Sequence, residues 1–209
     1  MRIALIHALK HSIAPIEAAF AKLWPEAELM NLLDDSLSAD LARDGRLTEG
    51  MTDRFLALGN YVAWTGADAI LFTCSAFGPC IEAVARAQKP MPVLKPNEAM
   101  IEEAVKQGRR IGLLSTFPPT LASMPSEFPP SVELVPKLAE GALAALDRGD
   151  RAEHDRLVAE AAKDLRGCDV IALAQYSMAP AAAVVAEVSG RPVLTTPDSA
   201  VQKLKAALA

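Results

Sequence analysis

The amino-acid sequence predicts an α/β protein in which mostly parallel sheets are flanked by helices and arranged as two pseudo-symmetric lobes. Short apolar runs alternate with segments of helical length and pattern, which is typical of strands joined by crossover helices. The order of these segments repeats once along the chain, and the two copies share residues. Of the 209 residues, 51% are hydrophobic, so the chain can bury a sizeable core.

Four strands are expected in the first half. The run RIALIHA at 2–8 is continuous and apolar, as in a parallel strand buried on both faces. Pro15 is suited to the first turn of a helix, and Thr48 is suited to cap one. The expected strands are 2–8, 28–33, 67–73 and 92–94. The expected helices are 15–23, 48–65, 79–87 and 97–107, with a short helix or an ordered loop at 37–44.

The same alternation begins again at the run RIGLLS. Gly108 ends the preceding helix, because glycine favours helix C-termini. The long segment 151–165 has an amphipathic face. The expected strands are 110–115, 132–135, 170–174 and 192–194, and the expected helices are 139–146, 151–165, 180–188 and 199–208.

Three windows support an internal duplication. RIALIHA at 2–8 matches RIGLLST at 110–116, and GADAILFTCSAFGP at 66–79 matches GCDVIALAQYSMAP at 167–180. PVLKPNEA at 92–99 matches PVLTTPDSA at 192–200. Apolar strands resemble one another by chance, but three windows in one order favour two copies of a structural unit. We expect one lobe at 1–95, with a helix at 197–209 packing back on it, and a second lobe at 96–196.

The repeat also predicts where a ligand binds. Ligands of parallel α/β sheets lie beyond the carboxyl ends of the strands, and two such lobes are expected to leave an active-site cleft between them. The segments that follow strands are therefore the candidates for this cleft: 7–10, 34–36, 74–78, 115–120 and 175–178.

Cys74 is the candidate catalytic residue. It ends a strand and stands just before a helix, where backbone N–H groups favour negative charge and lower the pKa of a thiol. The alternative is a buried structural cysteine, which is the interpretation we give to Cys80 and Cys168. Three cysteines suggest reduced thiols and not a disulfide framework, and their spacing does not predict a zinc site.

Hydroxyl, amide and imidazole groups near the other strand ends are candidates for binding substrate. Ser115 and Thr116 follow a strand and can hold a carboxylate, although a solvated turn is an equal alternative. His7 occupies the matching position in the first half, where a half-buried structural histidine is as plausible as a functional one. His11 and His154 are expected on the surface. The predicted binding residues are His7, Ser75, Ala76, Ser115, Thr116, Thr120, Gln175, Tyr176 and Ser177.

Composition and missing motifs argue against several classes of protein. The net charge of −5, with no basic stripe, argues against a nucleic-acid partner. No apolar run is long enough to span a bilayer. There is no GxGxxG or GxxxxGK[ST] motif, so no nucleotide cofactor is expected, and there is no GxSxG elbow either. No cluster of Cys and His accompanies Cys74 and Cys80, so no metal is expected. A strand that starts at the second residue leaves no room for a leader, which favours a cytoplasmic location.

The segment TCSAFG after the strand DAILFT, within duplicated halves, resembles the aspartate/glutamate/hydantoin racemase superfamily over essentially the whole chain. The resemblance implies two lobes that clamp a small carboxylate, with no cofactor, and a homodimer or larger assembly. It implies that Cys74 is one of two cysteines that exchange a proton at the substrate α-carbon. It also implies that Ser75, Ser115 and Thr116 bind the substrate carboxylate.

The second cysteine of that superfamily is missing, because Gln175 stands in its register. An amide cannot exchange a proton at ordinary pH. Arylmalonate decarboxylases resemble this pattern chemically, since a single cysteine protonates the enolate that loss of CO2 leaves. Three hypotheses follow: a one-thiol racemase or isomerase, a one-thiol decarboxylase acting on a substituted malonate, and a non-catalytic carboxylate-binding protein. No cluster of Arg or Lys is evident for a second substrate carboxylate, which favours a mono-acid.

Overall fold

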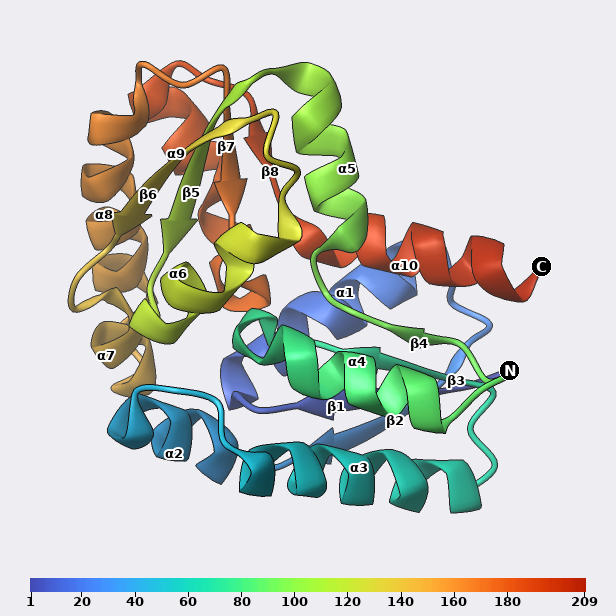
Figure 1. The fold of residues 1–209 in the computed structure, drawn as a ribbon. Coiled ribbons are helices and arrows are strands. Elements are labelled where there is room, and N and C mark those ends of the chain that lie inside the picture. Colours follow the sequence, from blue (N-terminus) through green and yellow to red (C-terminus); the bar gives the residue numbers. More distant parts are fainter. The chain divides into compact units, whose positions relative to one another are not determined.

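The computed structural model describes residues 1–209. The chain divides into two compact units, one formed by Met1–Pro96 with Pro197–Ala209 and the other by Asn97–Thr196. Each unit contains a four-stranded, all-parallel sheet with helices packed against it (Figure 1). The predicted α/β class with flanked parallel sheets is therefore confirmed.

Unit 1 has the strand order β2-β1-β3-β4. Its two central strands are almost wholly buried, because helices cover both faces of the sheet. The strands are β1 (Arg2–His7), β2 (Glu28–Leu33), β3 (Ala69–Phe72) and β4 (Val93–Leu94). The α-helices are α1 (Ile13–Leu23), α2 (Ser36–Asp44), α3 (Glu49–Trp64), α4 (Gly78–Ala87) and α10 (Thr196–Leu208, of which Thr196 belongs to unit 2).

Helix α10 is the last element of the chain, yet it packs on the first unit. Lys22 of α1 forms an ion pair of 2.6 Å with Asp198. Lys205 Nζ donates to the carbonyl of Leu23 at 3.1 Å and lies 5.9 Å from the ring centroid of Trp24. The side chains of Val201 and Leu204 are fully buried. The helix thus completes the core of unit 1.

Unit 2 repeats this topology with the strand order β6-β5-β7-β8. The strands are β5 (Arg110–Ser115), β6 (Glu133–Leu138), β7 (Val170–Leu173) and β8 (Val193–Leu194). The α-helices are α5 (Glu98–Gln107), α6 (Pro118–Ser123), α7 (Ala142–Asp147), α8 (Arg151–Ala162) and α9 (Ala182–Ser189).

The core of unit 2 lies on both faces of its sheet. Ile111 and Leu113 of β5 face a cluster that contains Met100 of α5. Leu114 belongs to the opposite cluster, which contains Val158 of α8. This alternation follows from the two-residue period of a strand. The carboxyl ends of the strands remain as the place where polar residues gather.

An equivalent hydrogen bond occurs within each unit, in addition to the common topology. Asp68 Oδ2 accepts from the Arg2 amide at 2.7 Å, and Asp169 Oδ2 accepts from the Arg110 amide at 2.9 Å. Both aspartates lie in the matched windows at an offset of 101 residues. The duplicated residues therefore make the same clamp at the start of the first strand of each unit.

Most elements lie where the sequence predicts them, and the exceptions have local causes. Residues 118–123 form α6, although the sequence suggested only a hydroxyl-rich turn after the strand. Its two prolines occupy the first turn, where a missing N–H does no harm. Strand β6 continues past the expected end at 135 to Leu138, and Pro136 is tolerated because β6 is an edge strand.

None of the helices is both long and apolar enough to cross a membrane. The described chain has no group of three or more His, Cys, Asp or Glu side chains placed to hold a metal ion.

Candidate functional site

Cys74 lies two residues beyond the end of β3 and caps a short 3-10 helix, η2 (Ser75–Phe77), which leads directly into α4. Its backbone is still extended, with φ −115° and ψ 118°. The side chain is half-buried, whereas Cys80 and Cys168 are buried. Cys74 therefore has the strand-end placement that the sequence predicts.

An aromatic cluster holds this loop in place. Phe77, at the end of η2, is fully buried, and its ring centroid lies 4.9 Å from that of Phe55 in α3. Phe55 in turn stacks on Phe72 at the end of β3, at 5.2 Å. The residues before and after Cys74 are thus anchored to the same core, which limits the freedom of the thiol.

The protonation state of Cys74 differs from the sequence prediction. Burial raises the pKa of the thiol to about 11, while hydrogen bonds from the Ala76 amide and the Ser38 hydroxyl lower it. The helix N-terminus thus acts in the expected direction, but desolvation of the thiolate outweighs it. The expectation of a lowered pKa is therefore wrong, and Cys74 is a neutral thiol at pH 7.

Ser38 is a site residue that the sequence analysis missed. It lies in α2, and its hydroxyl donates to the carbonyl of Ala8 at 2.5 Å. The segment 34–36, considered for the mouth of the site, serves instead to fix this helix. Arg54 of α3 bonds Asp34 and Asp40 at 2.6 Å each. The ion pairs hold α2 where Ser38 faces Cys74.

His7 is fully buried at the end of β1. Its Nδ1 lies 2.8 Å from Thr73 Oγ1 and 3.1 Å from Ser12 Oγ, and its Nε2 lies 2.9 Å from Asn31 Oδ1. Burial lowers the pKa of His7 below its ordinary 6.5, against the hydrogen bond to Asn31 and the charge of Glu17. Both ring nitrogens are engaged within unit 1, so the structure favours a supporting role over the predicted contact with substrate.

Gln175 occupies the corresponding strand end in unit 2. Its Oε1 accepts from the Thr116 amide at 2.7 Å, and the hydroxyls of Ser115 and Thr116 lie at 2.9 and 3.1 Å. The backbone amide can only donate, which fixes Oε1 and not Nε2 at this position. Three donors that were predicted to bind a carboxylate thus hold the Gln175 oxygen, and these bonds leave both Nε2 hydrogens unused.

The remaining predicted residues also follow strands. Ser75 and Ala76 are buried in η2, and Thr120 is buried in α6. Tyr176 and Ser177 begin the 3-10 helix η5 (Tyr176–Ala181) that precedes α9. Burial raises the pKa of Tyr176, so its hydroxyl stays protonated. The buried Ser177 hydroxyl has no hydrogen-bond partner. The shared cleft concerns the placement of the two units and stays a prediction.

The other cysteines and His154 show no reactive setting. Cys168 lies just before β7, at the opposite end of that strand from Gln175, and burial raises its pKa. Cys80 lies in α4, and its Sγ is 3.4 Å from the Oγ1 of Thr52 in α3. His154 is fully buried, so its expected surface position is wrong. Its Nδ1 lies 2.6 Å from Asp155 Oδ1, which compensates for burial of the polar ring.

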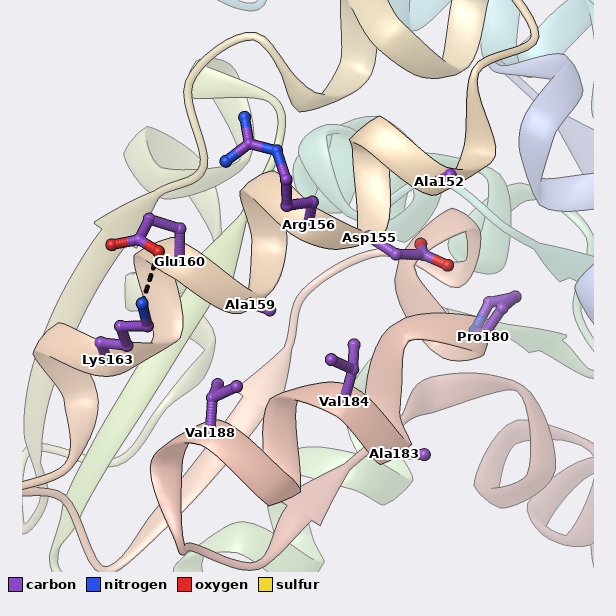
Figure 2. A pocket seen from close by; sticks show the side chains of 10 residues that line it. All are labelled: Ala152, Asp155, Arg156, Ala159, Glu160, Lys163, Pro180, Ala183, Val184 and Val188. Atoms are coloured by element: carbon purple, nitrogen blue, oxygen red, sulfur yellow. Dashed lines mark hydrogen bonds and ion pairs between the residues drawn. The ribbon is translucent and has the colours of Figure 1, made fainter.

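A surface groove of about 570 Å³ lies on unit 2 along α8 and α9 (Figure 2). Ala159, Val184 and Val188 contribute apolar surface, and Glu160 and Lys163 on its rim pair with each other at 2.6 Å. None of the predicted site residues lines this groove. It contains no nucleophile and no unpaired cluster of charge, so it does not compete with Cys74 as a catalytic site.

Several solved structures with the same fold are racemases or a racemase homologue. A glutamate racemase from Thermus thermophilus in complex with β-chloro-D-alanine matches 99% of this chain and 80% of its own, with a TM-score of 0.77 and 18% identity. An allantoin racemase from Klebsiella pneumoniae matches 100% and 87% of the two chains, with a TM-score of 0.69 and 19% identity. An aspartate racemase homologue from Pyrococcus horikoshii matches 99% and 98%, with a TM-score of 0.69 and 15% identity.

A search of curated protein sequences found no match. The model of the Asp/Glu/hydantoin racemase family matches residues 12–204, which include both units and the strand-end loops of Cys74 and Gln175. The resemblance seen in the sequence is thereby confirmed, and the chain belongs to the Asp/Glu/hydantoin racemase family of enzymes.

Proposed function

We propose that this protein is a cofactor-independent enzyme of the racemase and isomerase type that exchanges a proton at the carbon next to a carboxylate, with Cys74 as its single thiol acid/base. The observation that carries the proposal is the setting of Cys74. It is half-buried at a strand end, anchored by Phe77, and faced by the Ala76 amide and the Ser38 hydroxyl. The Ala76 amide stabilises the thiolate that forms when the proton leaves, and the Ser38 hydroxyl does so when it turns its hydrogen from the Ala8 carbonyl to the sulfur.

Donors around the two strand-end loops supply the remaining chemistry. A carbanion next to a carboxylate is stabilised as an enolate when N–H and O–H groups meet its oxygens in a dry site. We assign this role to Ser75 in unit 1, and to Thr120, the Gln175 Nε2 group, Tyr176 and Ser177 in unit 2. Thr116 contributes by holding Gln175 through its oxygen. Ser177 supports the assignment because its buried hydroxyl lacks a protein partner, which is costly unless a ligand or water satisfies it.

A second candidate function is decarboxylation of a substituted malonate, and two observations favour it. Cys74 is a neutral thiol at pH 7 and therefore begins the reaction as an acid. The pseudo-equivalent residue Gln175 is held through its oxygen and cannot titrate. In this reaction the bond to CO2 breaks and its electron pair forms the enolate. The α-carbon then takes the Cys74 proton, and water restores the thiol.

A panel of small acids tests both candidates. Purified protein is incubated in deuterated water with α-amino acids, hydantoins and substituted malonates. Exchange of the α-hydrogen, optical rotation and release of CO2 are followed. We expect solvent deuterium at the α-carbon of product, and we expect Cys74→Ala to lower the rate by at least about 10²-fold, the scale of a lost acid/base group.

Cys80→Ser is the matched control, because Cys80 is buried beside Thr52, which offers the new hydroxyl a partner. It should keep the wild-type rate. Deuterium exchange without CO2 release identifies the racemase or isomerase, and CO2 release identifies the decarboxylase. If wild type and Cys74→Ala bind a small acid equally well and neither exchanges deuterium across the panel, the protein is a binding module and the enzyme proposal fails.

A further inference from the structure

A compact polar cluster is built around Thr73, the residue that precedes Cys74. Its members are His7 at the end of β1, Thr73 next to the thiol, and Ser12 before α1. Thr73 Oγ1 lies 2.8 Å from both His7 Nδ1 and Ser12 Oγ, and the Ser12 hydroxyl donates to the Leu9 carbonyl at 2.7 Å. Two longer contacts complete the cluster: Ser12 Oγ lies 3.1 Å from His7 Nδ1, and Thr73 Oγ1 lies 3.5 Å from the Ile6 carbonyl.

Asn31 connects this cluster to the surface. Its Nδ2 donates to Glu17 Oε1 at 2.7 Å, so its Oδ1 is the atom that faces His7 Nε2 at 2.9 Å. Because a carboxamide oxygen only accepts, Nε2 must carry a hydrogen. The one open question at the ring is therefore whether Nδ1 also carries a hydrogen.

The number of hydrogens decides how many contacts are satisfied. With neutral His7, Thr73 donates to Nδ1 and Ser12 donates to Leu9. The Ser12 and Thr73 oxygens then face each other at 2.8 Å with no hydrogen between them. With protonated His7, Nδ1 donates to Thr73, Thr73 donates to Ser12, and Ser12 donates to Leu9. Each of the three shortest contacts then has its own hydrogen, and only the two longer contacts, at 3.1 and 3.5 Å, have none.

Opposing effects act on the protonation of His7. Burial favours the neutral ring, while Glu17 across Asn31 favours the cation, and the net result is a lowered pKa. The other acid close to the ring's backbone is Asp34, whose amide donates to the His7 carbonyl at 3.0 Å, but its carboxylate is bound to Arg54. The titratable group on the β3 side is Cys74, a neutral thiol in this pH range.

We propose that His7 is a positioning residue for Cys74 that acts through Thr73: the protonated ring locks the strand end by turning the Thr73 hydroxyl toward Ser12, and loss of the proton releases it. The consequence for catalysis rests on the proposed function of Cys74, but the lock itself does not. A locked strand end holds Cys74 within the loop, so the intrinsic reactivity of its thiolate is lower on the acid side of the His7 titration.

Two measurements on the full chain test this proposal. Alkylation of Cys74 by iodoacetamide is followed across pH by peptide mass spectrometry, and the three histidine ring resonances are titrated by NMR, with His7 assigned from its loss in His7→Asn. In wild type, the logarithm of the rate should rise with pH and show an extra step of roughly two- to fivefold, the effect of about one hydrogen bond. The step should coincide with the His7 midpoint.

Three variants separate this lock from a general structural effect. Thr73→Val should abolish the step while His7 still titrates, and Thr73→Ser, which keeps the hydroxyl, should retain it. Glu17→Gln keeps an acceptor for Asn31 but removes the charge that favours the cation. In that variant, the His7 midpoint and the alkylation step should move to lower pH together. Glu17 is near the surface, so this variant should fold, and the shift of its alkylation step to lower pH tests the proposal even if His7→Asn does not fold and the His7 resonance stays unassigned.

Several results would overturn the lock. In wild type, these are a plot of the logarithm of the alkylation rate against pH that stays straight through the His7 midpoint, or a step of opposite sign. In the variants, they are a step that survives in Thr73→Val, or a step that stays at the same pH in Glu17→Gln while the His7 midpoint moves. A His7 ring that keeps one protonation state from about pH 4 to 8, around the usual histidine pKa of about 6.5, would do the same. Deuterium exchange in the substrate panel is scored separately, so failure of the lock and failure of the enzyme proposal are distinguishable.

Discussion

At the scale of single residues, Cys74 illustrates how two local effects oppose each other. Donors at the start of η2 and in α2 stabilise the thiolate, but the Phe77 cluster and neighbouring chain remove water from it. Removal of water has the larger effect on the pKa. A thiol of this kind gives up its proton only to a strong base such as a carbanion, or when a bound substrate alters the site.

The first residue-scale prediction concerns the titration of Cys74. We expect the alkylation rate of Cys74, measured by peptide mass spectrometry, to reach half of its maximum near pH 11. A free cysteine titrates near about 8.5. A midpoint below 8.5 would contradict the desolvation that we describe.

A second prediction concerns Ser38. Because its hydroxyl lowers the pKa of Cys74, Ser38→Ala should move the alkylation midpoint to higher pH. Ser36→Ala is the control, since Ser36 lies on the same helix but bonds Arg54 and Asp34. It should leave the midpoint in place. An unchanged midpoint in Ser38→Ala would remove Ser38 from the site.

The sequence located Cys74 and Gln175 because strand ends and repeat registers can be found in a single chain. It did not reveal Ser38, Ser12 or Asn31, which approach the site from elements 36 to 62 positions away from Cys74 in the chain. The sign of the Cys74 pKa shift was missed for the same reason, since desolvation depends on tertiary packing and not on the neighbours in sequence.

At the scale of elements, the packing of α3 against α4 helps to hold the Cys74 loop, because α4 begins directly after η2. Gly59 lies where the two helices meet, and a Cβ built there would be 2.6 Å from Val84 Cγ1. Both residues are buried. The glycine therefore permits the close approach of α3 to the helix that begins just after η2.

We expect Gly59→Ala to lower the free energy of unfolding by about 1–2 kcal/mol, because overpacking outweighs the better helix propensity of alanine. In Gly59→Ala with Val84→Ala, the cost should be smaller than the sum of the two single changes. Urea unfolding of the four proteins measures this coupling. Strict additivity would show that the Val84 methyl is not what excludes a side chain at position 59.

Strands were predicted more reliably than short helices. The strands β3 and β7 are apolar throughout, and β1 and β5 are apolar between their first and last residues, because both sheet faces are covered. This pattern is visible in the sequence. Helix α6 and the 3-10 helices η2 and η5 have only three to six residues. Segments this short lack a hydrophobic period, so only tertiary packing defines them.

At the scale of the whole molecule, the two units exchange helices along the chain. Helix α5 follows β4 of unit 1 but belongs to unit 2, and α10 follows β8 of unit 2 but packs on unit 1 from Pro197 onward. The match of PVLKPNEA with PVLTTPDSA places these two helices at corresponding points of the repeat. Each unit is therefore completed by a helix that directly follows the last strand of the other unit.

This exchange predicts a crossed pattern of stability. Leu204→Ala in α10 should weaken protection from hydrogen exchange in residues 1–96, and Met100→Ala in α5 should weaken it in residues 97–196. Both side chains are fully buried, so each change should cost about 2–5 kcal/mol. Hydrogen exchange followed by mass spectrometry resolves the two regions. Equal loss of protection in both regions for both variants would contradict the assignment of each helix to one unit.

The exchange of helices also sets an order of events as the chain leaves the ribosome. Unit 2 is continuous, so all of its residues are available once Thr196 has been made. The strands of unit 1 are translated first, but residues Pro197–Ala209 of this unit are translated last. Only then can α10 pack on Trp24 and pair with Lys22. Domains fold as units when their residues become available. The half of the protein that is translated first is therefore the half that is finished last.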